Sequence, residues 1–134
     1  MSCTRYLYKD FLDAIPLFRN LSLETITYLC QLVRPLSALK DEVLLEEGRV
    51  DTACYFIIAG EVEVQSKGVR LGFLGKKGFF NESSLIGGGN IIQRTHIATT
   101  TTDMGYVTRA DLEELASGNA ELNLRLKMFA NGLR

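Results

Sequence analysis

The stretch ACYFIIAGEVEVQ, residues 53–65, changes the pattern of the chain from helical to strand-like. In an extended segment Val62 and Val64 point to one face, while Glu61 and Glu63 point to the other. A glycine separates this alternation from the apolar run that precedes it. The stretch therefore predicts two short strands that are joined by a turn.

More segments of this kind lie on both sides of the first. They are rich in β-branched or aromatic residues and glycines punctuate them: EVLLEEG (42–48), VRLGFLG (69–75), THIATTTT (95–102) and DMGYV (103–107). The four threonines at 99–102 are expected to lie in a strand with one exposed face. Strands this short and this closely spaced favour a closed β-roll or barrel over a parallel sheet.

Helical patterns flank the strands. Residues 4–15 carry apolar side chains at helical spacing, and Ser22 is a plausible N-cap of a second helix. After the strands, Thr108 and Asn119 are expected to cap two more helices. The sequence thus predicts a helical segment at 1–35, a β-roll at 36–107 and C-terminal helices at 108–134.

The composition fits one globular domain. The chain has 134 residues, of which 46% are hydrophobic and 23% charged, with a net charge of -1. This charge argues against a nucleic-acid binder that works through bulk positive charge. No apolar run approaches the length of a membrane span. Cys30 and Cys54 lie in apolar runs and are expected to be buried, reduced thiols.

A metal enzyme of the cupin type is also disfavoured. Such sites need several histidine and carboxylate ligands, and His96 is the single histidine of the chain. We therefore expect no metal and no catalytic site, and the plain interpretation of His96 is a polar strand residue.

The segment GFFNESSLIGGGNIIQRT, residues 78–95, carries the candidate chemistry. A short helix that starts near Ser83 and Ser84 would point free N–H groups at an anion. Arg94 could add a fork of donors to the same anion. Glu82 would repel a bare phosphate, so it is better suited to accept a hydrogen bond from a sugar hydroxyl. A phosphate site and a sugar site side by side indicate a nucleotide that is bound without a metal.

A plainer interpretation of the same residues stays open. The acidic residue and the serines could be a helix cap, and Arg94 could lie on the surface of a hairpin. The GGG at 87–89 is not followed by Lys-Ser or Lys-Thr, so it is not a Walker phosphate loop.

Five segments, in this order, resemble the cyclic nucleotide-binding domain family. They are AIPLF (14–18), EEGRVDTACYFIIAGEVEV (46–64), GFFNESSL (78–85), RT (94–95) and YVTRADLEEL (106–115). The resemblance covers nearly the whole chain. It implies an α+β, mainly β fold: an eight-stranded antiparallel β-roll, jelly-roll-like, that is flanked by N-terminal helices and by two C-terminal helices.

The resemblance also implies roles for individual residues toward a cyclic nucleotide, cAMP or cGMP. Glu82 matches the acceptor of the ribose 2′-hydroxyl, and Arg94 matches the partner of the cyclic phosphate. The remaining members of the implied site are the cassette residues Phe80, Asn81, Ser83 and Ser84, the phosphate or guanine contact Thr95, the purine-flanking Val64 and Leu74, and the lid residue Arg134.

Some positions depart from the family pattern. Asn81 stands where the cassette usually has glycine, but asparagine tolerates a positive φ, so we expect the turn to survive. His96 stands where a small residue usually follows the Arg-Thr pair, and it could narrow the pocket or supply a donor. Gly72 implies a looser base pocket.

The terminal segments YKDFLDAIPLF (8–18) and LRLKMFANGL (124–133) look most like the tail domains of cyclic nucleotide-regulated channels. The resemblance implies a cytoplasmic regulatory domain whose last helix, 119–134, closes over the ligand with Phe129, Leu133 or Arg134. Its expected partners are the cyclic nucleotide and the rest of a parent protein, through which it could form a homo-oligomer, with no nucleic acid and no direct membrane insertion.

Two alternatives keep the fold and change the function. The first is a homology domain with an empty or self-occupied pocket that acts as an interaction or gating module. The second is a module that binds a peptide or helix through the apolar stripe of the C-terminal helix.

Overall fold

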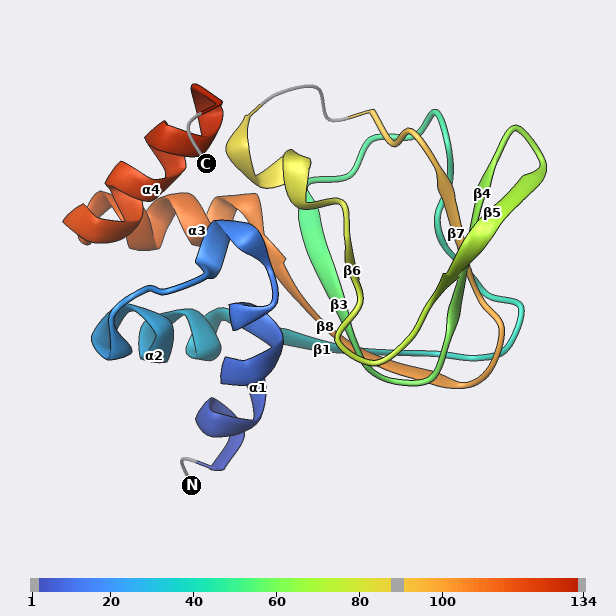
Figure 1. Cartoon of the computed structure of the whole chain (residues 1–134), viewed down its shortest axis with the longest axis horizontal. Helices are drawn as coiled ribbons and strands as arrows, with labels where there is room; N and C mark the ends of the chain where they lie inside the picture. The colour runs from blue at the N-terminus through green and yellow to red at the C-terminus, as the bar shows by residue number, and fades with distance from the viewer. Residues whose placement is uncertain (1–2, 88–90, 133–134) are drawn as a thin grey trace.

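The computed structural model of the chain describes residues 3–87 and 91–132, and it places helices on one side of a β-roll (Figure 1). The N-terminal helices are α1 (Cys3–Asp13), the 3-10 helix η1 (Pro16–Phe18) and α2 (Leu23–Leu32). The strands are β1 (Arg34–Ala38), β2 (Val43–Leu45), β3 (Ala53–Ala59), β4 (Val62–Ser66), β5 (Val69–Leu74), β6 (Phe79–Phe80), β7 (Thr95–Ala98) and β8 (Thr102–Thr108). The short 3-10 helix η2 (Glu82–Ile86) follows β6, and α3 (Arg109–Ser117) and α4 (Ala120–Ala130) follow β8.

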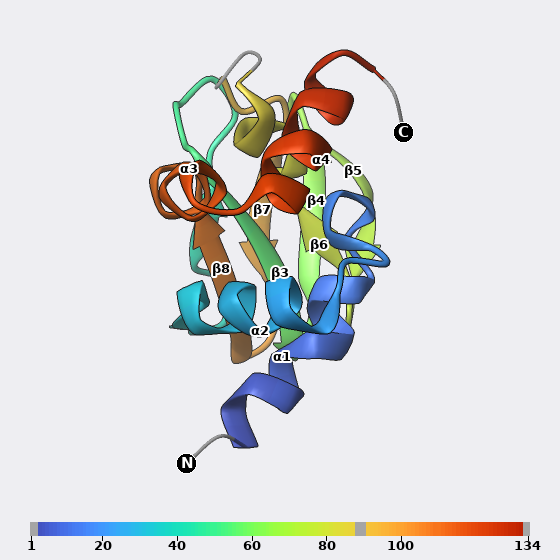
Figure 2. The same cartoon turned by 90° about the vertical axis from the view of Figure 1, so that its left-hand side faces the viewer.

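The strands form two sheets of four. One has the order β1-β8-β3-β6 and the other the order β2-β7-β4-β5, and every named pair is antiparallel. Within the described residues this confirms the predicted eight-stranded antiparallel roll between helical segments. Figure 2 shows α2, α3 and α4 grouped on the side of the molecule that carries β3 and β8.

Side-chain caps fix the starts of three helices where the sequence predicts them. Ser22 Oγ accepts a hydrogen bond from the N–H of residue 25 at 3.2 Å, at the start of α2. Thr108 Oγ1 accepts from the N–H of Asp111 at 3.1 Å, and Asn119 Oδ1 accepts from that of residue 122 at 2.9 Å. These bonds satisfy backbone donors that the first turn of a helix leaves free.

Two hydrophobic cores lie on the two faces of β3. Phe56 faces the helices and is fully buried with Phe18, Leu112 and Leu122. Its neighbour in sequence, Ile57, faces the inside of the roll, in the other cluster. The alternation of a strand therefore divides the apolar run of 53–65 between the two cores. The thiols of Cys30 and Cys54 are buried in the helical core, as predicted.

The threonine run is an exception to the sequence prediction. Only Thr102 lies in a strand, because the chain turns between β7 and β8 at residues 99–101. Thr102 Oγ1 accepts from the N–H of Glu61 at 3.2 Å, and the N–H of Thr99 donates to the Glu61 carbonyl at 3.0 Å. The run therefore forms hydrogen bonds to the turn between β3 and β4. These tertiary contacts override the β propensity of threonine.

The second helix ends at Leu32, before Pro35, which lies in the edge strand β1. A proline there removes no hydrogen bond from the interior of a sheet. Within the described part of the chain, none of the helices has the length and apolar character that crossing a membrane requires.

Candidate functional site

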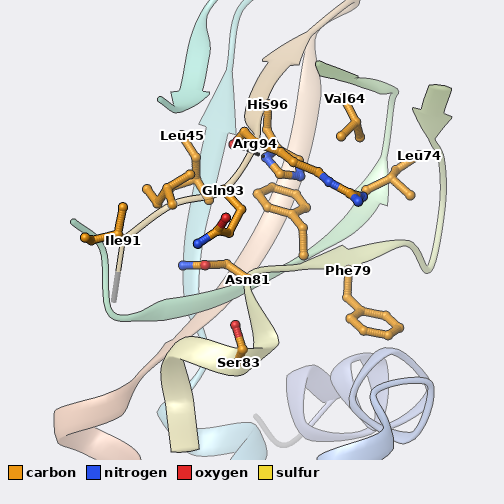
Figure 3. A pocket seen from close by; sticks show the side chains of 12 residues that line it. Leu45, Val64, Leu74, Phe79, Asn81, Ser83, Ile91, Gln93, Arg94 and His96 are labelled. Atoms are coloured by element: carbon orange, nitrogen blue, oxygen red, sulfur yellow. Dashed lines mark hydrogen bonds between the residues drawn. The ribbon is translucent and has the colours of Figure 1, made fainter. Parts of the chain in front are cut away.

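A pocket of about 330 Å³ lies at the mouth of the roll, between the second sheet and the turn from β6 into η2 (Figure 3). That volume is within the range of small-molecule sites in proteins. The described residues that line it are Leu45, Val64, Leu74, Phe79, Phe80, Asn81, Ser83, Ile91, Ile92, Gln93, Arg94 and His96.

One side of the pocket is apolar and rigid. Val64 on β4 is 8% exposed, Phe80 on β6 is 5% exposed and Ile92 is buried, so their positions are fixed by the core of the roll. Leu74 at the end of β5 lies on the same wall, and it faces the pocket in Figure 3. This wall can cover the faces of a planar, weakly polar group such as a base.

The pocket also carries polar side chains and one cation. Asn81, Ser83, Gln93 and Arg94 bring amide, hydroxyl and guanidinium groups to the rim, and the Arg94 side chain crosses the opening toward Leu74 in Figure 3. Among the described lining residues, Arg94 is the only one with a permanent charge, and none of them has a carboxylate. The arrangement is suited to an anion.

Asn81 forms the turn on which the cassette begins. Its backbone is left-handed, with φ 67° and ψ 28°, and its side-chain Nδ2 donates to the carbonyl of Ala53 at 2.9 Å. Asparagine is one of the few non-glycine residues that adopt this conformation at low cost. The turn is therefore retained without the usual glycine, as the sequence predicts.

The carboxylate of Glu82 is directed away from the pocket. Its Oε2 accepts a hydrogen bond from the backbone N–H of Leu17 in η1 at 2.9 Å, and Glu82 is not among the lining residues. The sequence brings Glu82 and Arg94 to the same segment, but the structure does not direct both side chains into one hollow. The role of Glu82 toward a ribose stays a prediction.

Ser84 and Thr95 are used within the protein. The hydroxyl of Ser84 donates to the carbonyls of Ala53 at 3.2 Å and Asn81 at 2.8 Å, and Ser84 is 1% exposed. Thr95 Oγ1 accepts from the N–H of Glu47 at 3.1 Å. Neither side chain lines the pocket, whereas Ser83 does.

His96 lines the pocket from β7 and is 7% exposed. Its ring stacks on Phe80, with centroids 4.3 Å apart and an angle of 14° between the planes. Burial lowers the pKa of the imidazole to about 4, and the nearby charge of Arg94 acts in the same direction. The ring is therefore neutral near pH 7.

Residues 119–132, the described part of the predicted lid, are not among the residues that line this pocket. The described lining residues end at His96, and α4 packs against α3, η1 and η2 instead. Phe129, one of the expected lid contacts, is buried in the helical core at 6% exposure. Leu133 and Arg134 lie outside the described residues.

The sequence analysis did not single out several of the lining residues. Leu45 belongs to the β2–β7 ladder and is the cross-strand partner of His96, so strand pairing brings it to the pocket. Gln93 directly precedes Arg94 and reaches the same rim. Knowing how β7 pairs with β2 would have placed Leu45 beside His96 in the pocket, but the sequence alone does not give the register of these two strands.

The fold and the site together define a class of ligand-binding domain, and a comparison with family models identifies it. The model described as "Cyclic nucleotide-binding domain" matches residues 35–119. The chain therefore belongs to the cyclic nucleotide-binding domain family, which is a family of regulatory domains and not of enzymes.

The chain is also similar to part of a curated protein. A protein of Rhodopseudomonas palustris that is named as a putative potassium channel is 28% identical over 124 residues, which cover 88% of this chain and 29% of that protein. The chain thus spans less than a third of the length of this curated relative.

Two solved structures share the fold. A cyclic nucleotide-binding domain from Methylobacillus flagellatus KT has a TM-score of 0.76 and 24% identity, over 97% of this chain and 76% of that one. The C-linker and CNBHD of the zELK channel, crystallised in the presence of cAMP, has a TM-score of 0.74 and 24% identity, over 86% of this chain and 59% of that one.

Metal ligands do not gather in the described part of the chain. Over residues 3–87 and 91–132, no three His, Cys, Asp or Glu side chains form a group that could hold a metal ion.

Proposed function

We propose that this domain binds a cyclic nucleotide, cAMP or cGMP, in the pocket at the mouth of the roll. Arg94 pairs with the cyclic phosphate, Ser83 and Asn81 supply polar contacts beside it, and Val64 and Leu74 flank the base. The ligand is the regulatory signal, and no metal takes part.

One observation carries this proposal. The pocket of about 330 Å³ combines a buried apolar wall with a rim whose permanent charge, among the described lining residues, is the guanidinium of Arg94. A cyclic nucleotide has one negative charge and one planar base, so both of its ends find a matching surface. The membership of the chain in the cyclic nucleotide-binding family supports the same assignment.

Glu82 links the ligand to the N-terminal segment in this proposal. Its carboxylate now accepts from the N–H of Leu17 at 2.9 Å. Because a carboxylate accepts through two oxygens, a ribose hydroxyl can bond to Oε1 while Oε2 keeps its bond to Leu17, or it can replace that bond. In either case the ligand would be connected through Glu82 to η1.

The C-terminal helix transmits binding in this proposal. A second hollow, of about 390 Å³, lies where η2, α3 and α4 meet, and Ile86, Leu126 and Ala130 are among the apolar residues that line it. Leu85, in the same hollow, is already buried, and further closure of α4 toward η2 would cover more of Ile86, Leu126 and Ala130. A ligand that prefers the closed state about 100-fold would favour it by roughly 2.7 kcal/mol.

We further propose that the parent protein is a channel and that this domain lies on its cytoplasmic side. The named relative from Rhodopseudomonas palustris and the zELK structure support this setting. In such a parent the domain would move with the segment that precedes α1, and the assembly of the parent would set its oligomeric state.

The first test replaces the cation. Arg94→Ala should weaken the binding of cAMP and cGMP by about tenfold or more, because one charge-assisted hydrogen bond contributes about 1.5–3 kcal/mol. Isothermal titration calorimetry of both nucleotides against the wild type and the variant measures this change.

Arg70→Ala is the matched control, since it removes the same charge from the outer side of β5, where Arg70 pairs with Glu63 at 3.2 Å. It should leave the affinity unchanged. Equal affinity of the wild type and Arg94→Ala would contradict the role of Arg94, and no heat at about millimolar nucleotide would contradict the proposal as a whole.

A second candidate function has its own support. Glu82 is bonded within the protein, and the stacked rings of His96 and Phe80 occupy part of the mouth of the roll. These contacts suit a homology domain that keeps its pocket closed to nucleotides and acts as an interaction or gating module. The absence of binding in the titration would favour this alternative.

A further inference from the structure

His96 lies where β7 meets the ligand pocket. Its side chain faces the inside of the roll, and its backbone pairs with Leu45 on β2 and with Val64 on β4. The imidazole adds a polar ring to the lining of the pocket. Figure 3 shows it beside Arg94, which precedes the strand β7 by one residue.

The ring is held in one orientation. One face stacks on Phe80, and Phe80 in turn stacks on Tyr55, with centroids 5.3 Å apart. His96 Nδ1 lies 3.3 Å from the backbone carbonyl of Arg94. Because a carbonyl oxygen only accepts, Nδ1 carries the hydrogen in this contact, and Nε2 is the nitrogen that changes its protonation.

The charges around the ring favour its neutral form. Leu45, Val64 and Phe80, which pack against it from β2, β4 and β6, carry no charge, and the charged group that acts on it is Arg94, two residues before it in the chain. The phenol of Tyr55, behind Phe80, is neutral, and burial raises its pKa further above the ordinary value of tyrosine. Burial is likewise the largest cause of the lowered pKa of His96, and the charge of Arg94 adds to it.

An anion in the pocket would favour the protonated form of His96 over the neutral form. The negative charge of a phosphodiester beside Arg94 would offset the guanidinium and stabilise an imidazolium. A protonated Nε2 would also become a donor, which a phosphate oxygen can accept. The geometry therefore provides a second cationic group next to the first, but only when the anion is present.

We propose that His96 is a further ligand-contacting residue of this pocket, which takes up one proton from solvent when the cyclic phosphate binds and donates from Nε2 to that phosphate. The proposal rests on the proposed function, since it needs a cyclic nucleotide in the pocket. The phosphodiester stays a monoanion, and no covalent bond other than N–H is formed.

The direction in which ligand affinity changes with pH follows from the coupling between ligand binding and protonation of His96. The free protein binds a proton at His96 only near pH 4, whereas the complex binds it at a higher pH. Between these two values the complex holds more protons than the free protein, so affinity increases as the pH falls. Above the pKa of the complex the affinity is constant.

The experiment measures affinity for cAMP by titration calorimetry between about pH 8 and about pH 5. We expect wild-type affinity to be about tenfold higher at the lower end, since the uptake of a full proton changes affinity by at most tenfold per pH unit. Two buffers of different ionisation enthalpy report the proton uptake directly. His96→Gln keeps a polar side chain that does not titrate, and its affinity should not follow pH.

His96→Phe is a second variant that keeps an aromatic stack on Phe80, so a folding defect in the glutamine variant does not prevent the test. Equal pH profiles of the wild type and both variants, with Arg94→Ala still weakening binding, would overturn the role of His96 and leave the proposed function intact. Tighter binding by His96→Gln would also overturn it, because the ring would then be an obstruction. No binding by the wild type at any pH would overturn both proposals.

Discussion

Asn81 decides the local geometry of the cassette at the scale of one residue. Its backbone is left-handed and its side chain bonds to Ala53, which belongs to the neighbouring strand β3. Because both properties reside in one side chain, substitutions at this position can separate them. Alanine lacks both, whereas glycine restores only the conformational freedom.

Asn81→Ala should therefore destabilise the domain by about 2–3 kcal/mol, the sum of left-handed strain and one lost hydrogen bond. Asn81→Gly should cost about 1 kcal/mol, mainly the hydrogen bond. Urea unfolding of the three proteins measures the difference. An alanine variant as stable as the glycine variant would contradict this account of the turn.

Asn81 and Glu82 differ in how much of their geometry could be predicted from the sequence. The tolerance of Asn81 for a positive φ is an intrinsic property, so the sequence predicted it correctly. The partner of the Glu82 carboxylate is Leu17, which is 65 positions away in sequence. No local pattern indicates that contact, and the direction of the carboxylate relative to the pocket therefore could not be predicted.

At the scale of elements, α4 is attached to the start of α2 by one carboxylate. Glu121 accepts from the backbone N–H of Ser22 at 2.9 Å, from the Ser22 hydroxyl at 2.7 Å and from the Thr25 hydroxyl at 2.6 Å. The hydrogen bonds from Thr25 and Ser22 lower the pKa of Glu121. The first turn of the proposed lid helix is therefore bonded to the N-terminal segment.

Glu121→Ala should destabilise the domain by about 1–2 kcal/mol, because it leaves the buried hydroxyl of Thr25 without this acceptor. Folding lowers the pKa of Glu121. Its ionised carboxylate therefore stabilises the folded domain when the pH is above the usual pKa of a glutamate, and this stabilisation is lost as the pH falls through the lowered pKa of the folded protein. The difference in unfolding free energy between the wild type and the variant should therefore decrease toward low pH.

Glu114→Ala is the matched control, since Glu114 is an exposed glutamate on the neighbouring helix α3. It should change the stability little at any pH. A constant difference between the wild type and Glu121→Ala from neutral to acidic pH would show that the carboxylate charge does not contribute.

The elements themselves were largely predictable. The caps Ser22, Thr108 and Asn119 act within their own first turns, so sequence spacing was sufficient to find them. The threonine run at 99–102 was predicted to be a strand, and the structure places its first three residues in a turn. Its hydrogen bonds go to Glu61, about 40 residues away, and strand propensity gives no information on such a partner.

At the scale of the whole molecule, the backbone of Leu17 connects the N-terminal segment, the cassette and α4. Its N–H donates to Glu82 of the cassette, and its carbonyl accepts from the Arg125 guanidinium of α4 at 3.1 Å. Arg125 also donates to the carbonyl of Arg19 at 2.7 Å. A change at Glu82 on ligand binding would therefore reach both the N-terminal segment and the proposed lid helix through one short 3-10 helix.

Binding of the ligand should also increase the thermal stability of the whole domain. A cyclic nucleotide that binds only the folded domain stabilises it by mass action, whatever movement follows. At about 100 times its dissociation constant, cAMP should add about 2.7 kcal/mol to the free energy of unfolding. For a chain of this length that corresponds to an increase in Tm of roughly 10 °C.

Thermal unfolding monitored by circular dichroism, with and without cAMP, measures this increase, and 5′-AMP serves as the control because it lacks the cyclic phosphodiester. The Arg94→Ala variant should unfold at the wild-type temperature without ligand, since the Arg94 side chain is exposed, and should gain less from the same cAMP concentration. If cAMP raised the Tm of both proteins equally, the stabilisation would come from a contact elsewhere on the molecule. The pocket at the mouth of the roll would then not be the nucleotide site.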